Sequence, residues 1–242
     1  MGSREQVLAG LRAASMSGID SRGTADRLCQ ACVELLDVDG AAISFSVDGA
    51  IRGTFGASGE LSRRLDELQF TFGEGPCVDA VAGGRPVLAA DLNSPEHGRW
   101  PAFTGAALEA GVQAVFALPV ATPATPIGAL DLFRYRSGAL SDDGIAGGLE
   151  AAGLAGPPLL DLLTSDSGWT AFSDGEHAGN PLDSLERTEV YQATGMIMGQ
   201  LGVGPAEAMA RLRAYAFAHG TTASAVAWSI VERRLVLDFD SS

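Results

Sequence analysis

The 242-residue sequence contains no lysine, so all 16 of its basic side chains are arginines. They are outnumbered by 30 Asp and Glu residues, which gives a formal net charge of −14 at pH 7. A surface of this charge repels phosphate groups, so the chain does not have the composition of a general nucleic-acid binder. The acidity is uneven, because the part from Pro181 onward has five arginines and seven acidic residues, and the part before it has 11 and 23. A local basic face is therefore permitted near the C-terminus.

Cysteine is also scarce, with Cys29, Cys32 and Cys77 as the three examples. An odd and small number of cysteines excludes the disulfide framework of a small secreted domain. No stretch approaches the roughly 20 apolar residues that span a bilayer, and the N-terminus lacks the apolar core of a signal peptide. With 46% hydrophobic and 19% charged residues, the sequence predicts a folded cytoplasmic protein without membrane contact.

Catalytic and metal-binding motifs are few. The histidines are His97, His177 and His219, and neither a G-x-S-x-G nor an H-E-x-x-H motif occurs. Cys29 and Cys32 form a C-x-x-C pair, but a closed zinc site needs two more ligands, and Cys32 falls on the apolar stripe of a predicted helix. We therefore interpret this pair as packing residues and expect no catalytic residues, no metal site and no enzyme activity.

The first part of the chain alternates between helical and strand patterns. Apolar residues at helical spacing predict helices over 4–15, 22–37, 59–69, 76–83 and 141–163. The runs AAISFSV and IRGTFGA flank an Asp-Gly pair and predict a hairpin, and RPVLAAD, VQAVFALPV and PIGALDLFR predict three further strands. This order of elements predicts an α+β domain with an antiparallel sheet.

A second, all-helical part follows. Residues 164–181 are rich in Gly, Ser and Asp and lack a sustained period, which is typical of a linker. Helical patterns over 182–201, 205–218 and 221–235 then predict a three-helix bundle. We expect one domain over 1–163, a linker over 164–181 and a second domain over 182–242.

Two segments of the first domain offer candidate ligand-binding residues. Cys77 follows a Gly-rich GEGP turn at a predicted helix start, where a thiol can become reactive or can simply fill the core. His97, Arg99 and Trp100 share the segment DLNSPEHGRWPAF, which either lines a pocket or is an ordinary surface loop.

The helix pattern YQATGMIMGQLG carries Gly195 and Gly199 at a spacing that permits the close approach of another backbone or a ligand. Each internal glycine costs about 1 kcal/mol of helix stability relative to alanine, so we expect a compensating role. In the next helix Arg211 and Arg213 lie off the apolar face, as solvated charges or as part of a phosphate-binding surface.

Residues 187–235 resemble the ANTAR domain, a three-helix RNA-binding module of bacterial antitermination regulators. The resemblance lies in QATGMIM, EAMARLRAYA and VAWSIVERRL, in that order and spacing. It implies a homodimer that binds paired hairpins in nascent RNA and prevents transcription termination. Many members carry a basic residue where this chain has Thr194, which implies one phosphate contact fewer. The RNA-facing positions it implies are Arg187, Gln192, Ala193, Thr194, Gly195, Arg211 and Arg213.

Residues 20–163 resemble a GAF domain, a PAS-like sensory fold, through FGEGPC, DLNSPEHGRWPAF, GVQAVFALPV and IGALDLF. The resemblance implies that this domain controls the tail and binds a small molecule, whose identity the fold does not determine. Its candidate pocket residues are Cys77, His97, Arg99 and Trp100.

Two alternatives remain open. One is a thiol enzyme similar to the free methionine sulfoxide reductases, which would use Cys77 with Cys29 or Cys32. The other is a ligand-sensing module whose tail binds protein in place of RNA.

Overall fold

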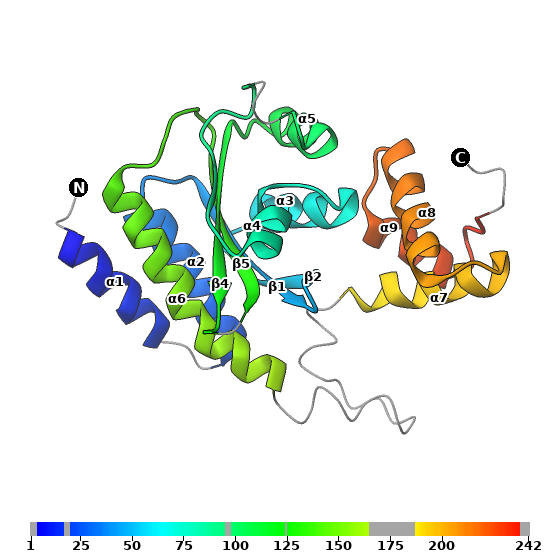
Figure 1. The fold of residues 1–242 in the computed structure, drawn as a ribbon, viewed down its shortest axis with the longest axis horizontal. Coiled ribbons are helices and arrows are strands. Elements are labelled where there is room, and N and C mark those ends of the chain that lie inside the picture. Colours follow the sequence, from blue (N-terminus) through cyan, green and yellow to red (C-terminus); the bar gives the residue numbers. More distant parts are fainter. Residues whose placement is uncertain (1–3, 17–19, 95–97, 124, 165–186, 238–242) are drawn as a thin grey trace.

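The computed structural model describes residues 4–16, 20–94, 98–123, 125–164 and 187–237 (Figure 1). The α+β domain consists of α1 (Arg4–Met16), α2 (Ser21–Leu35), β1 (Gly40–Val47), β2 (Ala50–Ala57), α3 (Glu60–Phe72), α4 (Pro76–Gly83), β3 (Val87–Ala89), α5 (Pro101–Glu109), β4 (Ala114–Ala121), β5 (Pro126–Arg134) and α6 (Asp142–Thr164). The C-terminal bundle consists of α7 (Thr188–Leu201), α8 (Pro205–Ala218) and α9 (Ala223–Val231). The α+β class and the helical bundle predicted from the sequence are both confirmed.

The five strands form one sheet in the order β2-β1-β5-β4-β3, and every neighbouring pair is antiparallel. The predicted hairpin is β1 and β2, joined by Asp48 and Gly49. Both turn residues have positive φ angles, 52° and 76°, as a two-residue hairpin turn compatible with strand twist requires.

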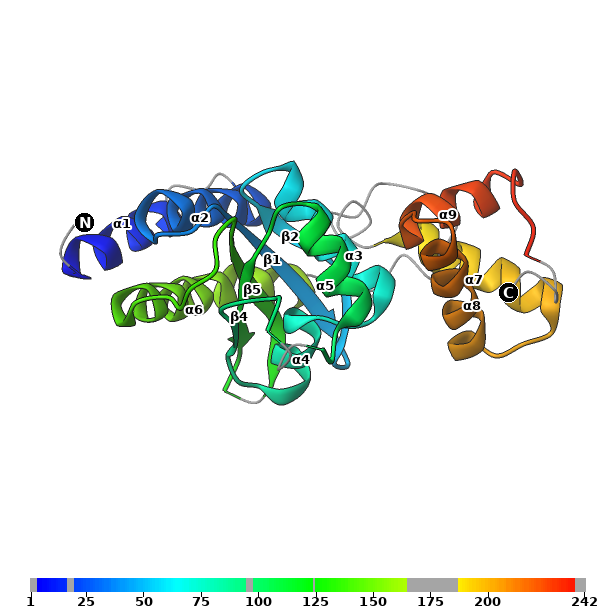
Figure 2. The same ribbon diagram turned by 90° about the horizontal axis from the view of Figure 1, so that it is seen from above.

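Helices cover both faces of the sheet, with α1, α2 and α6 on one face and α3, α4 and α5 on the other (Figures 1 and 2). Alternate side chains of a strand point to opposite faces. Ile43 of β1 and Leu130 of β5 pack into the main apolar core with α2 and α6. Their neighbours Ser44 and Asp131 therefore point to the face that α3 and α4 cover.

Helix α5 is the element that sequence analysis missed, because its segment was interpreted as a loop. It starts at Pro101, which suits the first turn of a helix. The carboxylate of Glu74 accepts hydrogen bonds from the backbone N–H groups of Ala102 and Phe103, at 2.8 and 3.1 Å. This cap comes from a residue distant in the sequence, so the local pattern does not reveal it.

The three helices of the C-terminal bundle pack around apolar side chains, of which Ala193, Ile197, Leu212 and Ala227 are fully buried. Helix α8 has the predicted limits, whereas α9 ends at Val231 and not at residue 235. The chain turns after α9 because Arg233 adopts a left-handed conformation with φ 58°. Residues 182–186 of the predicted first helix lie outside the described residues.

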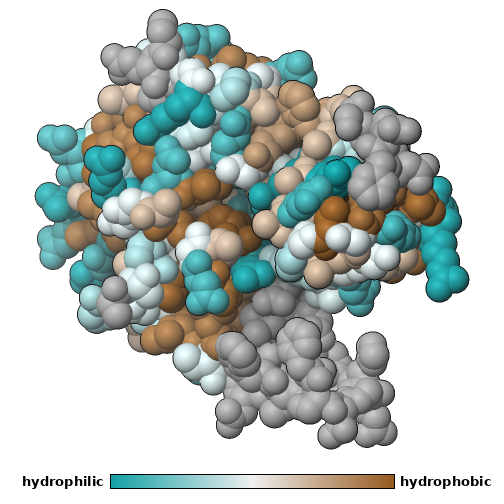
Figure 3. All heavy atoms as spheres, turned by 45° about the vertical axis from the view of Figure 1, so that its right-hand side comes forward, coloured by the Kyte–Doolittle hydropathy of each residue, from teal (hydrophilic) through white to brown (hydrophobic). Residues whose placement is uncertain are grey.

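The bundle packs beside α3 and the hairpin of the α+β domain (Figures 1 and 2). Its apolar core is continuous with buried residues of the first domain, including Ile51 and Phe70. In Figure 3 apolar side chains gather near the middle of the visible face, beside the bundle on the right. Within the described residues no helix is both long and apolar enough to cross a membrane.

Candidate functional site

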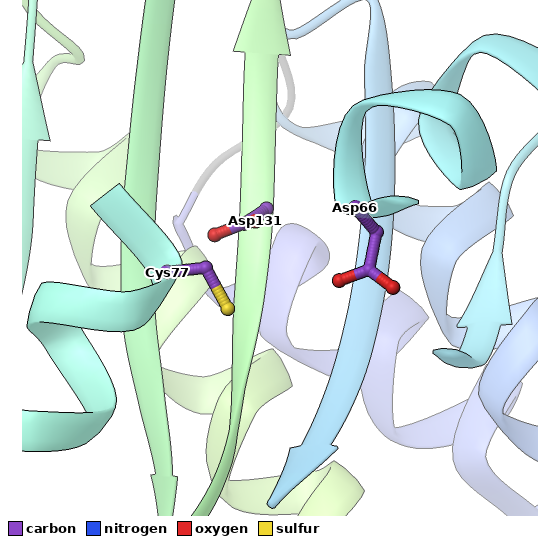
Figure 4. Close-up of side chains that lie close together, drawn as sticks. All are labelled: Asp66, Cys77 and Asp131. Carbon is purple, nitrogen blue, oxygen red and sulfur yellow. The ribbon is translucent and has the colours of Figure 1, made fainter. Parts of the chain in front are cut away.

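A buried polar cluster lies between the sheet and helices α3 and α4. Asp131 projects from β5, Cys77 from α4 and Asp66 from α3 (Figure 4). One ligand atom from each of the three lies within 4.8 Å of the others. The Ser44 hydroxyl of β1 is 2.9 Å from the Cys77 sulfur. Two helices and two strands that are distant in sequence thus bring acidic, hydroxyl and thiol groups together in the interior.

Gln69 of α3 connects the members of this cluster. Its amide nitrogen donates to Asp131 Oδ2 at 2.5 Å, and its Oε1 accepts from the backbone N–H of Cys77 at 2.8 Å. Gly75 leaves room for this side chain, since a Cβ there would lie 2.4 Å from Gln69 Oε1. Gly75 also has a φ of 137°, which side-chain-bearing residues rarely adopt. The GEGPC turn therefore positions Cys77 against Gln69 and the sheet.

Burial shifts the acid–base behaviour of the cluster. Desolvation, followed by the charge of Asp66, raises the pKa of Asp131 to about 8, although the Gln69 amide and the nearby Cys77 thiol act in the opposite direction. Desolvation and the charges of Asp131 and Asp66 also hold the pKa of the Cys77 thiol well above its ordinary value. Both groups are therefore protonated at neutral pH, and Cys77 is not an activated nucleophile.

A small pocket next to the cluster lies between α3, α5 and the sheet. Asp66, Gln69 and Asp131 form its polar side. The remaining lining residues are Ala42, Ser62, Leu65, Phe103, Val115 and Phe133.

The predicted pocket residues that the structure describes do not form one site, because Cys77 lies apart from Arg99 and Trp100. Cys77 is buried in the polar cluster, whereas Trp100 is buried in a separate apolar core with Phe103. Arg99 is exposed, stacks on Trp100 at 4.2 Å and pairs with Asp79 at 3.4 Å. His97 lies outside the described residues.

The other two cysteines lie on the opposite face of the sheet. Cys29 and Cys32 are fully buried in the core formed with α1 and α6, and burial raises the pKa of both thiols. Cys77 packs instead against the bundle side of the sheet. Because the sheet separates Cys77 from the other two, this conformation does not permit the close approach that a disulfide requires.

A second polar site joins the two domains at Arg187, which immediately precedes α7. Its guanidinium donates to Asp66 Oδ2 at 3.0 Å and to Glu67 Oε2 at 2.5 Å, and it lies 4.2 Å from the Phe70 ring centre. The Arg187 side chain is only 7% exposed and that of Asp66 only 1%. Arg187 is therefore held by α3 as a buried ion pair.

Glu67 also contacts the last helix of the bundle. Its Oε1 accepts from the Ser224 N–H in the first turn of α9 at 3.3 Å, where the helix dipole favours a carboxylate. The preceding backbone N–H, of Ala223, donates to the Thr71 hydroxyl at 3.0 Å. One helix of the first domain thus engages the starts of both α7 and α9.

The other predicted RNA-facing residues divide into buried and accessible positions. Ala193 and Thr194 are buried, and the Thr194 hydroxyl donates to the Val190 carbonyl at 2.6 Å. Gln192 and Gly195 are exposed on the outer face of α7, with open space around Gly195.

The two predicted arginines of α8 are each engaged by the protein itself. Arg211 pairs with Glu207 at 2.9 Å, and Arg213 is half-buried with its guanidinium 5.0 Å from the Phe70 ring centre.

A family model of the GAF domain matches residues 19–156, which is more than half of the chain. The chain belongs to the GAF family. A model of the ANTAR domain matches residues 184–231, so the C-terminal bundle is the ANTAR region that the sequence predicted. The GAF–ANTAR architecture is that of a sensory regulator with an RNA-binding output.

Solved structures support the GAF fold. The GAF domain of Acinetobacter phosphoenolpyruvate-protein phosphotransferase is 11% identical with a TM-score of 0.51, covering 67% of this chain and 96% of that one. Its counterpart from Coxiella burnetii is 18% identical, with a TM-score of 0.51 and coverages of 64% and 93%. The free methionine-R-sulfoxide reductase of Neisseria meningitidis is 15% identical, with a TM-score of 0.50 and coverages of 65% and 88%. At these identities the likeness shows the fold alone, and the comparison with curated proteins gave no match.

Asp131, Asp66, Glu67 and Gln69 are functional-site residues that were not predicted from the sequence. Asp131 had a visible signal, since it is the one charged residue inside the apolar run IGALDL. Asp66, Glu67 and Gln69 lie on an amphipathic helix, where polar residues are ordinary, so their burial against the sheet and the bundle left no signal in the sequence.

Proposed function

We propose that this GAF–ANTAR protein is a transcription antitermination regulator that acts as a homodimer on paired RNA hairpins. The ANTAR match and the preserved three-helix order support an RNA output. The accessible face of α7, with Gln192 and the bare backbone at Gly195, provides a surface that RNA can approach closely. In this proposal the protein is a regulator and not an enzyme, because its best-placed thiol is buried and protonated.

We further propose that the GAF domain controls this output through α3. The observation that carries the proposal is the buried pairing of Arg187 with Asp66 and Glu67. Arg187 is one of the residues that the ANTAR resemblance implies face RNA, and in this conformation α3 occupies its guanidinium. A state that loosens α3 would release Arg187 for phosphate, which binds guanidinium groups strongly.

The RNA function is tested with a labelled RNA that carries two hairpins and a matched RNA that carries one. Full-length protein is titrated into each at several salt concentrations. We expect tighter binding to the two-hairpin RNA and an affinity that falls as salt rises, since arginines displace counterions from phosphate. The same protein should increase read-through of a terminator that follows the hairpins in a purified transcription reaction.

Absence of binding to either RNA at every salt concentration contradicts the RNA function. Binding without any change in read-through contradicts antitermination while leaving an RNA-binding output. If the full-length protein binds neither RNA and its ANTAR tail captures a protein, the alternative of a protein-binding module would be favoured.

A further inference from the structure

We infer that Cys77, Asp131 and Asp66 form a site for one divalent metal ion that accepts a thiolate ligand, with zinc as the representative ion. The sulfur and one oxygen of each carboxyl lie within 4.8 Å of one another (Figure 4). Zinc binds sulfur at about 2.3 Å and carboxylate oxygen at about 2.0–2.2 Å. The three ligand atoms around a bound zinc ion would therefore lie roughly 1 Å closer to one another than the 4.8 Å limit observed here. Small side-chain movements are enough to close that difference.

Asp131 supplies the observation that points to a ligand. The residue is only 6% exposed, and among the described residues its buried Oδ1 has no hydrogen-bond partner within normal distance and angle limits, although the Cys77 thiol lies close enough to lower the Asp131 pKa. Its other oxygen is already occupied by the Gln69 amide. A buried polar atom without a partner is costly, and a bound cation would satisfy it.

Asp66 can serve the ion and the interdomain contact at the same time. The hydrogen bonds that it accepts from Thr54 and Arg187 both end on Oδ2. A metal ion can therefore take Oδ1 while Oδ2 keeps its donors, so one carboxylate would join the metal site to Arg187. The Gln69 side chain holds both Asp131 and the Cys77 backbone, as outer-shell partners of metal ligands commonly do.

The donor set selects the class of ion. One thiolate and two carboxylates suit a borderline-soft ion such as zinc, whereas magnesium and calcium prefer all-oxygen sites. The neighbouring pocket reaches Asp66 and Asp131 and offers room for a coordinating water.

An effect of this ion on the ANTAR output, through Asp66 and Arg187, would rest on the function proposed above, but the binding of the ion does not. The test uses full-length protein that has been stripped with a chelator and then titrated with cobalt(II), whose thiolate complexes absorb in the near ultraviolet. We expect a thiolate-to-cobalt band that saturates at one equivalent and disappears when zinc is added. Native mass spectrometry should show the matching mass increase for zinc.

The variants assign the ligands. Cys77→Ser should abolish the band, and Asp131→Asn should weaken cobalt binding at least about tenfold. Cys29→Ser is the matched control, because Cys29 is equally buried but lies on the other face of the sheet. Circular dichroism identifies variants that fail to fold, and Asp131→Asn, which keeps the side-chain shape, then carries the assignment.

No band and no bound zinc in the wild-type protein overturns the inference. A band that survives in folded Cys77→Ser, or is lost in folded Cys29→Ser, overturns it as well. A saturable band in protein that binds no RNA supports the metal site and contradicts only the proposed function.

Discussion

The carboxyl group of Asp131 stays protonated below about pH 8 in the folded protein, because desolvation and the charge of Asp66 raise its pKa to about 8. A raised carboxyl pKa means that the folded state holds a proton that the unfolded state releases. The contribution of Asp131 to stability is therefore fully present below the ordinary value of 3.8 and is lost as pH rises towards about 8.

The fall of this stabilising contribution with rising pH gives a prediction for the metal-free protein. Asp131→Asn removes the titration, so its stability relative to wild type should rise with pH, by up to about 1.4 kcal/mol per pH unit between the two pKa values. Urea unfolding at a series of pH values, with a chelator present, measures the difference. A constant difference across that range would show that Asp131 titrates normally.

Arg187 provides a second prediction at the residue scale. Arg187→Ala leaves Asp66 and Glu67 without their cation in a buried setting, which should cost about 3–5 kcal/mol of stability. Arg211→Ala is the control, because it removes a partly exposed pair with Glu207 worth about 0.3–0.5 kcal/mol. Thermal unfolding compares the two, and equal losses would contradict the buried ion pair.

At the scale of elements, the turn before α4 depends on Gly75, whose φ of 137° and closeness to Gln69 both exclude a side chain. Gly75→Ala should destabilise the protein by about 1–3 kcal/mol from backbone strain, with a further cost for displacing Gln69. Gly59 precedes α3 with an extended φ of 176° and open space around it. Gly59→Ala should therefore have little effect, and a similar loss in both variants in urea unfolding would argue against the turn geometry.

The sequence predicted most elements of both domains, because apolar periodicity and turn residues are local signals. The hairpin at Asp48 and Gly49 and the limits of α8 followed from such signals. Helix α5 did not, since its cap is Glu74. The candidate sites were predicted less well, because burial of Asp131 and Arg187 depends on elements that meet only in the folded chain.

For the whole molecule, the sequence predicted a GAF domain followed by an ANTAR domain, and the family matches confirm both. It did not predict how they meet. The ANTAR resemblance implies that Arg187 faces RNA. The structure places it against α3, where Asp66 and Glu67 carry the complementary charge.

The most direct measurement of interdomain control is the RNA affinity of full-length Glu67→Gln relative to wild type. Removing the Glu67 charge loosens the hold on Arg187 and on the start of α9 while keeping the side-chain shape. The account predicts tighter binding to the two-hairpin RNA, by about fivefold or more, the usual lower range of coupling between sites. Glu150→Gln, which breaks a distant pair with Arg12, should bind as wild type does. Equal affinities for wild type and Glu67→Gln, with both proteins folded, would contradict control of the ANTAR domain through α3.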